Sequence, residues 1–294
     1  MKAPGRLVVA SAAALLVAVS LLIAHLLTSP LPFLPCLHVV TAPSGTGYQP
    51  SGLAALADAA VYYATTPTVP QQNRDEISLS LAVLRRRAPM RLLVFGLGYD
   101  SPLWHALNPG GVTVFLEEDP EWYNVVRTES PFLRAHLVKY RTRLDHADAL
   151  FESYKRFNSC LPGAGSAEAA EPPVRIRGND DCPLALHNLP PEVYENEWDM
   201  LMVDAPKGYF PEAPGRMAAI WTAAAMAWSR SGEGDTDVFL HDVDRPVEKM
   251  YSEEFLCERF RVGGTGRLWH FSIPPVSRRG NTTAAAGGAD RPFC

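Results

Sequence analysis

The stretch from Arg91 to Pro120 constrains the fold of this chain more than any other. It opens on the apolar run LLVF at residues 92–95, which is typical of a buried parallel strand. A Gly-Leu-Gly turn follows at once, and a second β-rich run at residues 112–116 ends in Glu117. The order strand, glycine turn, helix, strand and acid is the plan of a nucleotide-type cofactor site in an α/β fold.

The glycine turn separates two classes of cofactor. A dinucleotide fingerprint has a third glycine where this chain has Ser101. Asp100 would repel a pyrophosphate, whereas it suits the cationic amino group of S-adenosylmethionine, which carries no phosphate. An acid such as Glu117 can accept hydrogen bonds from both hydroxyls of a ribose. We therefore expect Gly96, Gly98, Asp100 and Glu117 to bind S-adenosylmethionine, with a plain tight turn as the alternative.

Composition limits the classes of protein that this chain can belong to. Its 294 residues suit one targeting or membrane segment plus a domain of roughly 200–220 residues. A net charge of −5 gives no electrostatic case for binding nucleic acid. The five cysteines are widely spaced without a CxxC motif, which disfavours zinc. Cys160 and Cys182 bracket a Gly/Pro-rich excursion and can staple it, although the sequence alone leaves the pairing open.

The N-terminal region predicts a membrane anchor. Residues 7–27 carry no formal charge over 21 positions, enough for a helix to cross a bilayer. Lys2 and Arg6 precede this segment and the next basic residue is Arg74, so the positive-inside rule predicts a single-pass type II protein. A cleaved signal peptide and a buried soluble helix are the alternatives. The expected regions are a cytosolic tail (1–6), a transmembrane signal-anchor (7–27), a stem (28–72), a luminal domain (73–275) and a flexible tail (276–294).

The rest of the chain alternates between strand and helix patterns, which predicts a doubly wound, mostly parallel sheet. Asn73 is placed to cap a helix over residues 74–87, with Glu76 in its first turn. Ligands of such a sheet gather at the carboxyl ends of its strands. Further strands are expected at residues 137–140, 198–203, 236–240 and 266–273, and further helices at residues 53–63, 120–127, 144–157, 212–230 and 246–257.

Polar residues directly follow three of the predicted strands: Glu117, Asp204 and the pair His241-Asp242. Methyl transfer to a hydroxyl needs an acceptor oxygen held in line with the methyl group and a base for its proton. Asp204 is the first candidate for that base and His241 the second. Asp204 and Asp242 can instead hold a divalent metal that lowers the pKa of the hydroxyl.

Three basic residues lie in or just after these loops: Lys207, Arg216 and Arg245. They can clamp an anionic substrate such as a uronic-acid carboxylate. Salt bridges or helix starts are the alternative for Arg216 and Arg245. Tyr209 and Phe210 can stack on a sugar ring.

Four long phrases resemble the plant glucuronoxylan 4-O-methyltransferase family, and the similarity runs from about residue 73 to residue 275. They are LVFGLGYDSPLWHALNPGGVTVFLEEDPEW, WDMLMVDAPKGYFPEAPGRMAAIWTAA, TDVFLHDVDRPVEKMYSEEFLC and GRLWHFSIP. The resemblance implies a class I methyltransferase-like fold behind one membrane helix. It also implies a Golgi membrane protein that uses S-adenosylmethionine to methylate O-4 of glucuronic acid on xylan, or arabinogalactan in close relatives. By matching position, the cofactor would contact Gly96, Gly98 and Glu117, and the acceptor would face Asp204, His241 and Asp242.

The same resemblance leaves a second hypothesis open. The family includes irregular-xylem proteins needed for xylan deposition, so a non-catalytic Golgi scaffold with other xylan-synthesis proteins as partners is the alternative. A glycosyltransferase that uses the acids at residues 117–119 as a metal–nucleotide cluster is weaker, because Asp100 disfavours a nucleotide diphosphate. Tyr99 stands where His is expected in many relatives, and Lys207 follows DAP where DGP is expected. Both departures bear on which polysaccharide is the acceptor.

Overall fold

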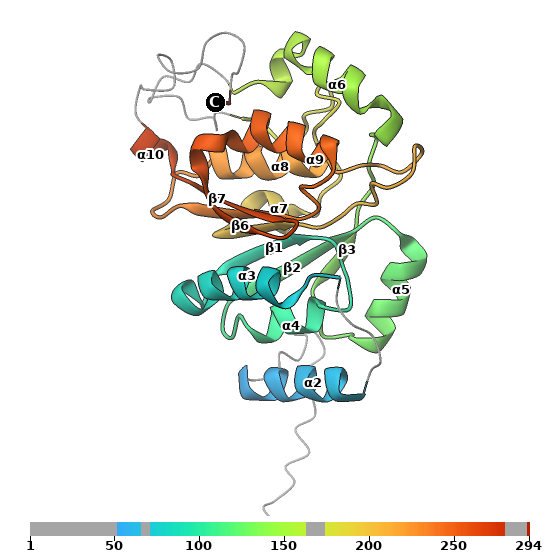
Figure 1. Cartoon of the computed structure of the whole chain (residues 1–294), viewed down its shortest axis with the longest axis vertical. Coiled ribbons are helices and arrows are strands. Elements are labelled where there is room, and N and C mark those ends of the chain that lie inside the picture. Colours follow the sequence, from blue (N-terminus) through green and yellow to red (C-terminus); the bar gives the residue numbers. More distant parts are fainter. Residues whose placement is uncertain (1–51, 66–70, 163–173, 280–292) are drawn as a thin grey trace, which may run out of the picture. The chain divides into compact units, whose positions relative to one another are not determined.

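The computed structural model describes residues 52–65, 71–162, 174–279 and 293–294 (Figure 1). The predicted cytosolic tail and signal-anchor, and the stem up to residue 51, lie outside these described residues. Within the described ranges, the helices are all too short or too polar to cross a bilayer.

A seven-stranded sheet organises the described part of the chain, in the order β3-β2-β1-β4-β5-β7-β6 (Figure 1). Strands β1 to β5 pair in parallel, and β7 runs antiparallel to both β5 and β6. The predicted doubly wound, mostly parallel sheet is therefore confirmed. The strands are β1 Arg91–Phe95, β2 Val112–Glu117, β3 Ala135–Leu137, β4 Met200–Val203, β5 Thr236–Leu240, β6 Arg261–Thr265 and β7 Leu268–Ile273.

Helices cover both faces of the sheet, with α3, α4 and α5 on one side and α8 and α9 on the other (Figure 1). Two apolar cores result, and alternate residues of β1 belong to each: Leu92 and Val94 to one, Leu93 and Phe95 to the other. This double burial explains why the strands read as continuous apolar runs. The helices are α2 Gly52–Thr65, α3 Arg74–Arg87, α4 Ser101–Ala106, α5 Pro120–Glu129, α6 Ala147–Ser153, α7 Pro191–Glu195, α8 Met217–Trp228, α9 Pro246–Ser252 and α10 Val276–Arg279.

The start of α3 follows the prediction. The Asn73 side chain accepts hydrogen bonds from the backbone of Asp75 and Glu76, and the Glu76 carboxylate accepts one from the Asn73 N–H at 2.8 Å. This reciprocal capping box satisfies backbone donors that would otherwise be free at the helix start. It also fixes where the chain enters the sheet edge that carries the site.

Other boundaries differ from the prediction for local reasons. Helix α8 begins at Met217 instead of residue 212, because Gly215 has φ +65° and cannot continue a right-handed helix. Strand β6 was not predicted, since its sequence RVGGT contains two glycines and is largely exposed at the sheet edge. The third strand, β3, pairs over residues 135–137 instead of 137–140.

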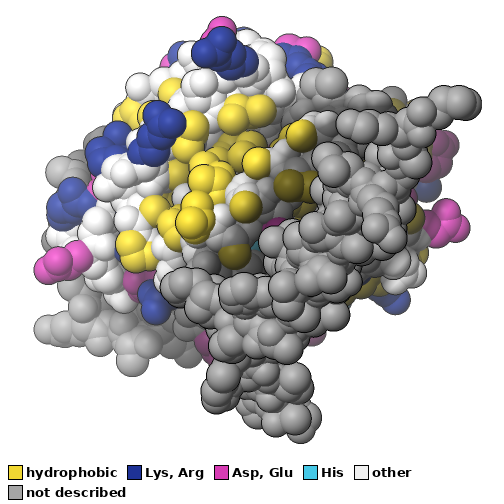
Figure 2. All heavy atoms as spheres, turned by 90° about the horizontal axis from the view of Figure 1, so that it is seen from below, with side chains coloured by type: hydrophobic (Ala, Val, Ile, Leu, Met, Phe, Trp, Pro, Cys, Tyr) yellow, Lys and Arg dark blue, Asp and Glu magenta, His cyan; other side chains and the backbone are white. Residues whose placement is uncertain are grey.

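Helix α2 belongs to the folded unit, although it lies N-terminal to the predicted domain boundary at residue 73. Its Tyr63 hydroxyl donates to the backbone oxygen of Tyr99 at 2.6 Å, beside the glycine turn. Its outward residues Leu53, Leu56 and Val61 are exposed. Figure 2 shows apolar side chains gathered on the face seen from below, the side on which α2 lies in Figure 1.

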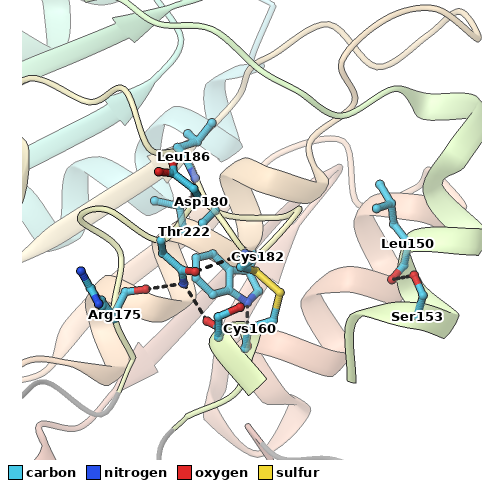
Figure 3. Close-up of a disulfide and its surroundings, with 12 residues drawn as sticks. Leu150, Ser153, Cys160, Arg175, Asp180, Cys182, Leu186 and Thr222 are labelled. Carbon is cyan, nitrogen blue, oxygen red and sulfur yellow. Dashed lines mark hydrogen bonds between the residues drawn. A yellow bond between two sulfur atoms is a disulfide. The ribbon is translucent and has the colours of Figure 1, made fainter. Parts of the chain in front are cut away.

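Two disulfides fasten the layer that contains α8. The Cys160–Cys182 bond closes the excursion, as the sequence allowed (Figure 3). The Trp221 indole N–H donates to the Cys160 backbone oxygen at 3.1 Å. A second disulfide joins Cys257 to Cys294, and Phe293 beside it is buried. The expected flexible tail therefore ends on residues that are anchored to the domain.

Candidate active site

A cavity of about 430 Å³ opens at the carboxyl ends of β1, β2 and β4. Its size is within the range of small-molecule sites, roughly 300–1,000 Å³. The strand order reverses between β1 and β4, which is the place where open α/β sheets bind ligands. All four predicted cofactor residues line it, together with Asp204, Asp242, Lys207, Arg216 and Arg245.

The glycine turn forms the floor of this cavity with bare backbone. Gly96 has φ +128°, and a Cβ there would lie 3.3 Å from the Cβ of Ala205 in the loop after β4. A Cβ on Gly98 would lie 2.8 Å from a carboxylate oxygen of Asp100. A side chain at residue 96 would press on the loop after β4, and one at residue 98 would displace the Asp100 carboxylate, so both positions favour glycine.

Glu117 reaches the glycine turn from the end of β2. One of its oxygens accepts from Leu97 N at 3.1 Å, and the other accepts from Glu118 N and Asp119 N. Burial, and then the charge of Glu118, raise the pKa of Glu117 to about 8. Three backbone N–H groups thus fix the carboxyl in place, and Oε2 keeps one lone pair for a further hydrogen bond.

A second acid, Asp100, lies across the cavity near Asp204. Its carboxylate accepts a hydrogen bond from the Trp104 indole at 2.7 Å. Burial, and then the charge of Asp204, raise the pKa of Asp100 to about 6. Two carboxylates that repel each other favour a cation between them.

Asp204 is held by three side chains. Its Oδ1 accepts from His241 Nδ1 at 3.0 Å and from Arg216 at 3.1 Å, and its Oδ2 accepts from Gln72 Nε2 at 3.1 Å. Burial alone would raise the pKa of Asp204, but the hydrogen bond from His241 and the charge of Arg216 outweigh it and lower the pKa. Asp204 is therefore an anion at neutral pH.

His241 lies behind Asp204 and is not among the residues that line the cavity. Only 1% of its side chain is exposed, and its Nε2 is 3.5 Å from Glu76 Oε2. Burial lowers the pKa of His241, but the hydrogen bond to Asp204 and the charges of Asp204 and Asp242 raise it overall. An imidazole between carboxylates keeps its own proton, so this geometry favours Asp204 over His241 as the base.

Asp242 has φ 60°, an uncommon conformation for a residue with a side chain. Its carboxylate pairs with Arg216 at 2.8 Å, Arg245 at 2.9 Å and Arg267 at 2.6 Å. Asp204, His241 and Asp242 do place one potential ligand atom each within 4.8 Å of one another. However, a divalent cation there would have to displace Arg216 and would face its positive charge, so the residues present fit arginine better than a metal.

The three predicted substrate-binding cations all line the cavity, but each is already paired. Lys207 forms an ion pair with Asp119, and Arg245 donates to the Gly208 backbone oxygen at 3.4 Å. Arg216 is buried and bridges Asp204 and Asp242. Lys207 and Arg245 are the more accessible pair, which places them at the mouth and Arg216 at the base.

Several lining residues were given no role in the sequence analysis: Gln71, Gln72, Trp104 and Trp122. Glu118 and Asp119, considered there only as part of a metal–nucleotide cluster, also line the cavity. Trp122 packs edge-on against Tyr99, with ring centroids 4.9 Å apart. No sequence signal singles out Gln72, which contacts a carboxylate 132 positions away. Glu76 was predicted only as a helix-start acid, although it also faces His241.

The parallel sheet with an antiparallel β7, the glycine turn after β1 and the acid after β2 define an α/β protein similar to class I methyltransferases. The chain belongs to the IRX15/IRX15L/GXM family, whose sequence model matches residues 75–271. The family predicted from the sequence is thus confirmed.

Several proteins from Arabidopsis thaliana are similar in sequence to this chain. Arabinogalactan O-methyltransferase 2 is 59% identical over 73% of this chain and 71% of its own length. Glucuronoxylan 4-O-methyltransferase 1 is 44% identical over 81% of this chain and 79% of its own length. Protein IRREGULAR XYLEM 15 is 37% identical over 70% of this chain and 61% of its own length.

Solved structures resemble this chain more distantly. The O-methyltransferase from Bacillus cereus in complex with SAH is 14% identical, with a TM-score of 0.34 over 80% of this chain and 93% of that protein. Precorrin-6y C5,15-methyltransferase from Geobacter metallireducens is 12% identical, with a TM-score of 0.37 over 71% and 92% of the two chains.

Proposed function

We propose that this protein is an S-adenosylmethionine-dependent O-methyltransferase that acts on a uronic-acid-bearing wall polysaccharide. The observation that carries the proposal is the cavity itself, where Asp100, Glu117 and Asp204 surround a glycine turn. The charges of Asp100 and Asp204 attract a cationic donor and repel a diphosphate. The names of the relatives support the same reaction class.

The residues around the cavity divide the work of methyl transfer. S-adenosylmethionine, when bound, supplies a methyl group on a cationic sulfur. Gly96 and Gly98 would let the backbone approach the nucleoside, Glu117 would accept a hydrogen bond from its ribose, and Asp100 would face its amino group. Asp204 would accept a hydrogen bond from the acceptor hydroxyl and take its proton when the methyl group moves from sulfur to that oxygen.

Among acceptors, we infer O-4 of glucuronic acid on arabinogalactan ahead of the same position on xylan. The two arabinogalactan enzymes are 59% and 56% identical to this chain, compared with 44% for a glucuronoxylan enzyme. At the mouth of the cavity, Lys207 and Arg245 offer cations to a uronate, and Tyr209 exposes 69% of its surface for stacking on a sugar.

We further infer a single-pass type II protein of the Golgi membrane with the catalytic domain in the lumen. The uncharged segment at residues 7–27, with basic residues only before it until Arg74, supports this topology. The disulfides Cys160–Cys182 and Cys257–Cys294 are of a kind that persists in oxidising compartments.

Two measurements test the proposed reaction. Calorimetry of the full chain with S-adenosylhomocysteine should detect binding at micromolar concentrations. Incubation with a labelled methyl donor and a panel of demethylated wall polymers should label O-4 of glucuronic acid, most strongly on arabinogalactan. Absence of transfer to every polymer of the panel would reject the enzymatic function, whether or not the donor product binds.

A non-catalytic scaffold is the second candidate, favoured by the membership of an irregular-xylem protein in the same family. It predicts donor binding without transfer to any uronosyl acceptor, together with co-purification of glycosyltransferases. Transfer to any polymer of the panel would exclude it.

A further inference from the structure

Gln72 is buried at the edge of the cavity, with 4% of its surface exposed. Its amide nitrogen donates to Asp204 Oδ2 at 3.1 Å. Its amide oxygen is also buried and has no hydrogen-bond partner among the described residues. A buried carbonyl without a donor is unfavourable, so this oxygen does not explain by itself why an amide stands here.

The two oxygens of Asp204 differ in what they can still bind. Oδ1 already accepts from both His241 and Arg216, whereas Oδ2 accepts only from Gln72. Oδ2 therefore keeps the lone pair that a ligand hydroxyl can use. The two donors on Oδ1 restrain the plane of the carboxylate, and the Gln72 donor determines which lone pair of Oδ2 stays open.

We propose that Gln72 is a positioning residue that acts through Asp204. Its amide holds Oδ2 so that the remaining lone pair faces the hydroxyl that is to be methylated. The unsatisfied carbonyl is retained because Met or Leu would fill the space but could not donate. This inference rests on the proposed methyl transfer, and residue 72 lies outside the segment matched by the family model.

Gln72→Met in the full chain separates positioning from structure. It removes the unsatisfied carbonyl, which favours the folded state, and the donor to Asp204 Oδ2, which disfavours it, so the free energy of unfolding should change little. The kcat for methyl transfer should fall about tenfold or more, as expected when a catalytic base loses its alignment, while the KM for the donor stays within about twofold. Ser80→Ala is the matched control, since its buried hydroxyl also lacks a partner but does not line the cavity. It should leave both kcat and KM unchanged.

Gln72→Glu adds a second measurement, the pH profile of kcat, which should not change if Gln72 only stabilises the fold. A second carboxylate at 3.1 Å from Asp204 raises the pKa of Asp204, so the acidic limb of the kcat profile should shift to higher pH. A wild-type kcat in Gln72→Met, or an unmoved acidic limb in Gln72→Glu, overturns the role of Gln72. Absence of transfer by the wild-type chain instead rejects the proposed function, so the two failures are distinguishable.

Discussion

Two clusters of buried ions lie at opposite ends of the parallel strands. We call the side of the sheet where the strands begin the amino edge, and the side where they end the carboxyl edge. At the amino edge, Asp237 pairs with Arg87 and His270, and Asp199 pairs with Arg230. At the carboxyl edge, the acids are Asp204 and Asp242, with Arg216 and His241 between them. Both clusters combine Asp, Arg and His, so residue type alone does not tell them apart.

The clusters differ in how completely their polar atoms are satisfied. Both oxygens of Asp237 and both of Asp199 have partners, and Arg230 Nε is the atom of this amino-edge group that lacks a hydrogen bond among the described residues. At the carboxyl edge, Gln72 Oε1, Arg216 Nε and His241 Nε2 all lack one. A closed cluster stabilises the fold, whereas an incomplete one beside a cavity marks where a ligand binds.

Among the substitutions that test this comparison, Asp204→Asn is expected to have the largest effect. The amide keeps the shape of the side chain but loses the charge that accepts the proton. We expect kcat to fall about 10²–10⁴-fold, with affinity for S-adenosylhomocysteine changed by less than about threefold. Methyl-transfer kinetics and calorimetry measure the two quantities. Near-wild-type turnover would remove Asp204 from the mechanism.

The matching change at the amino edge, Asp237→Asn, should act on stability alone. It removes the carboxylate between His270 and Arg87, although Arg87 keeps Asp199 at 3.6 Å, and breaking a buried pair in this way costs about 3 kcal/mol. Urea unfolding measures the loss. The folded protein should bind S-adenosylhomocysteine as the wild type does, and a weaker affinity would show that the amino edge is coupled to the site.

Ligand affinity measured against pH tests the role of Glu117, whose pKa is raised to about 8. Ribose hydroxyls donate to the ionised carboxylate, so nucleoside binding should release a proton. Affinity for 5′-methylthioadenosine, which lacks the α-amino and carboxyl groups of the methionine part, should therefore rise about tenfold or more from pH 6 to pH 8 and level off only above the pKa of Glu117. Calorimetry in buffers of different ionisation enthalpy detects the proton. Glu117→Gln should bind more weakly, with a flat pH profile.

The smallest effect concerns His241, whose folded pKa is raised. Its contribution to stability is fully present below the unfolded pKa of about 6.5 and is lost as pH rises through the folded pKa. Urea midpoints should therefore decline from pH 6 upward, and His241→Asn should flatten that part of the curve. An equal decline in the variant would assign the pH dependence to other groups.

The sequence was sufficient for the parts of the fold that depend on local pattern. Apolar runs located β1, β2, β4 and β5, and the strand ends located Glu117, Asp204 and Asp242. The edge strand β6 was missed because exposed glycines carry no apolar pattern.

The parts of the site that could not be predicted depend on distant pairings. Gln72 meets Asp204 across 132 positions, and Glu76 accepts a hydrogen bond from Arg267 N across 191 positions. Which of two neighbouring residues faces the cavity is equally non-local. Asp242 lines it and His241 does not, because the turn at Asp242 takes a positive φ.

The hydrogen bond from Tyr63 to Tyr99 has a practical consequence for recombinant work on this protein. A fragment trimmed to the family-matched residues 75–271 would lose α2, Gln72 and the helix cap at Asn73. It would also uncover the side of α4 on which α2 rests. Such a fragment would expose apolar surface and would lack the contacts that Gln72 makes in the cavity. A loss of methyl transfer in the fragment should therefore not be assigned to the whole chain.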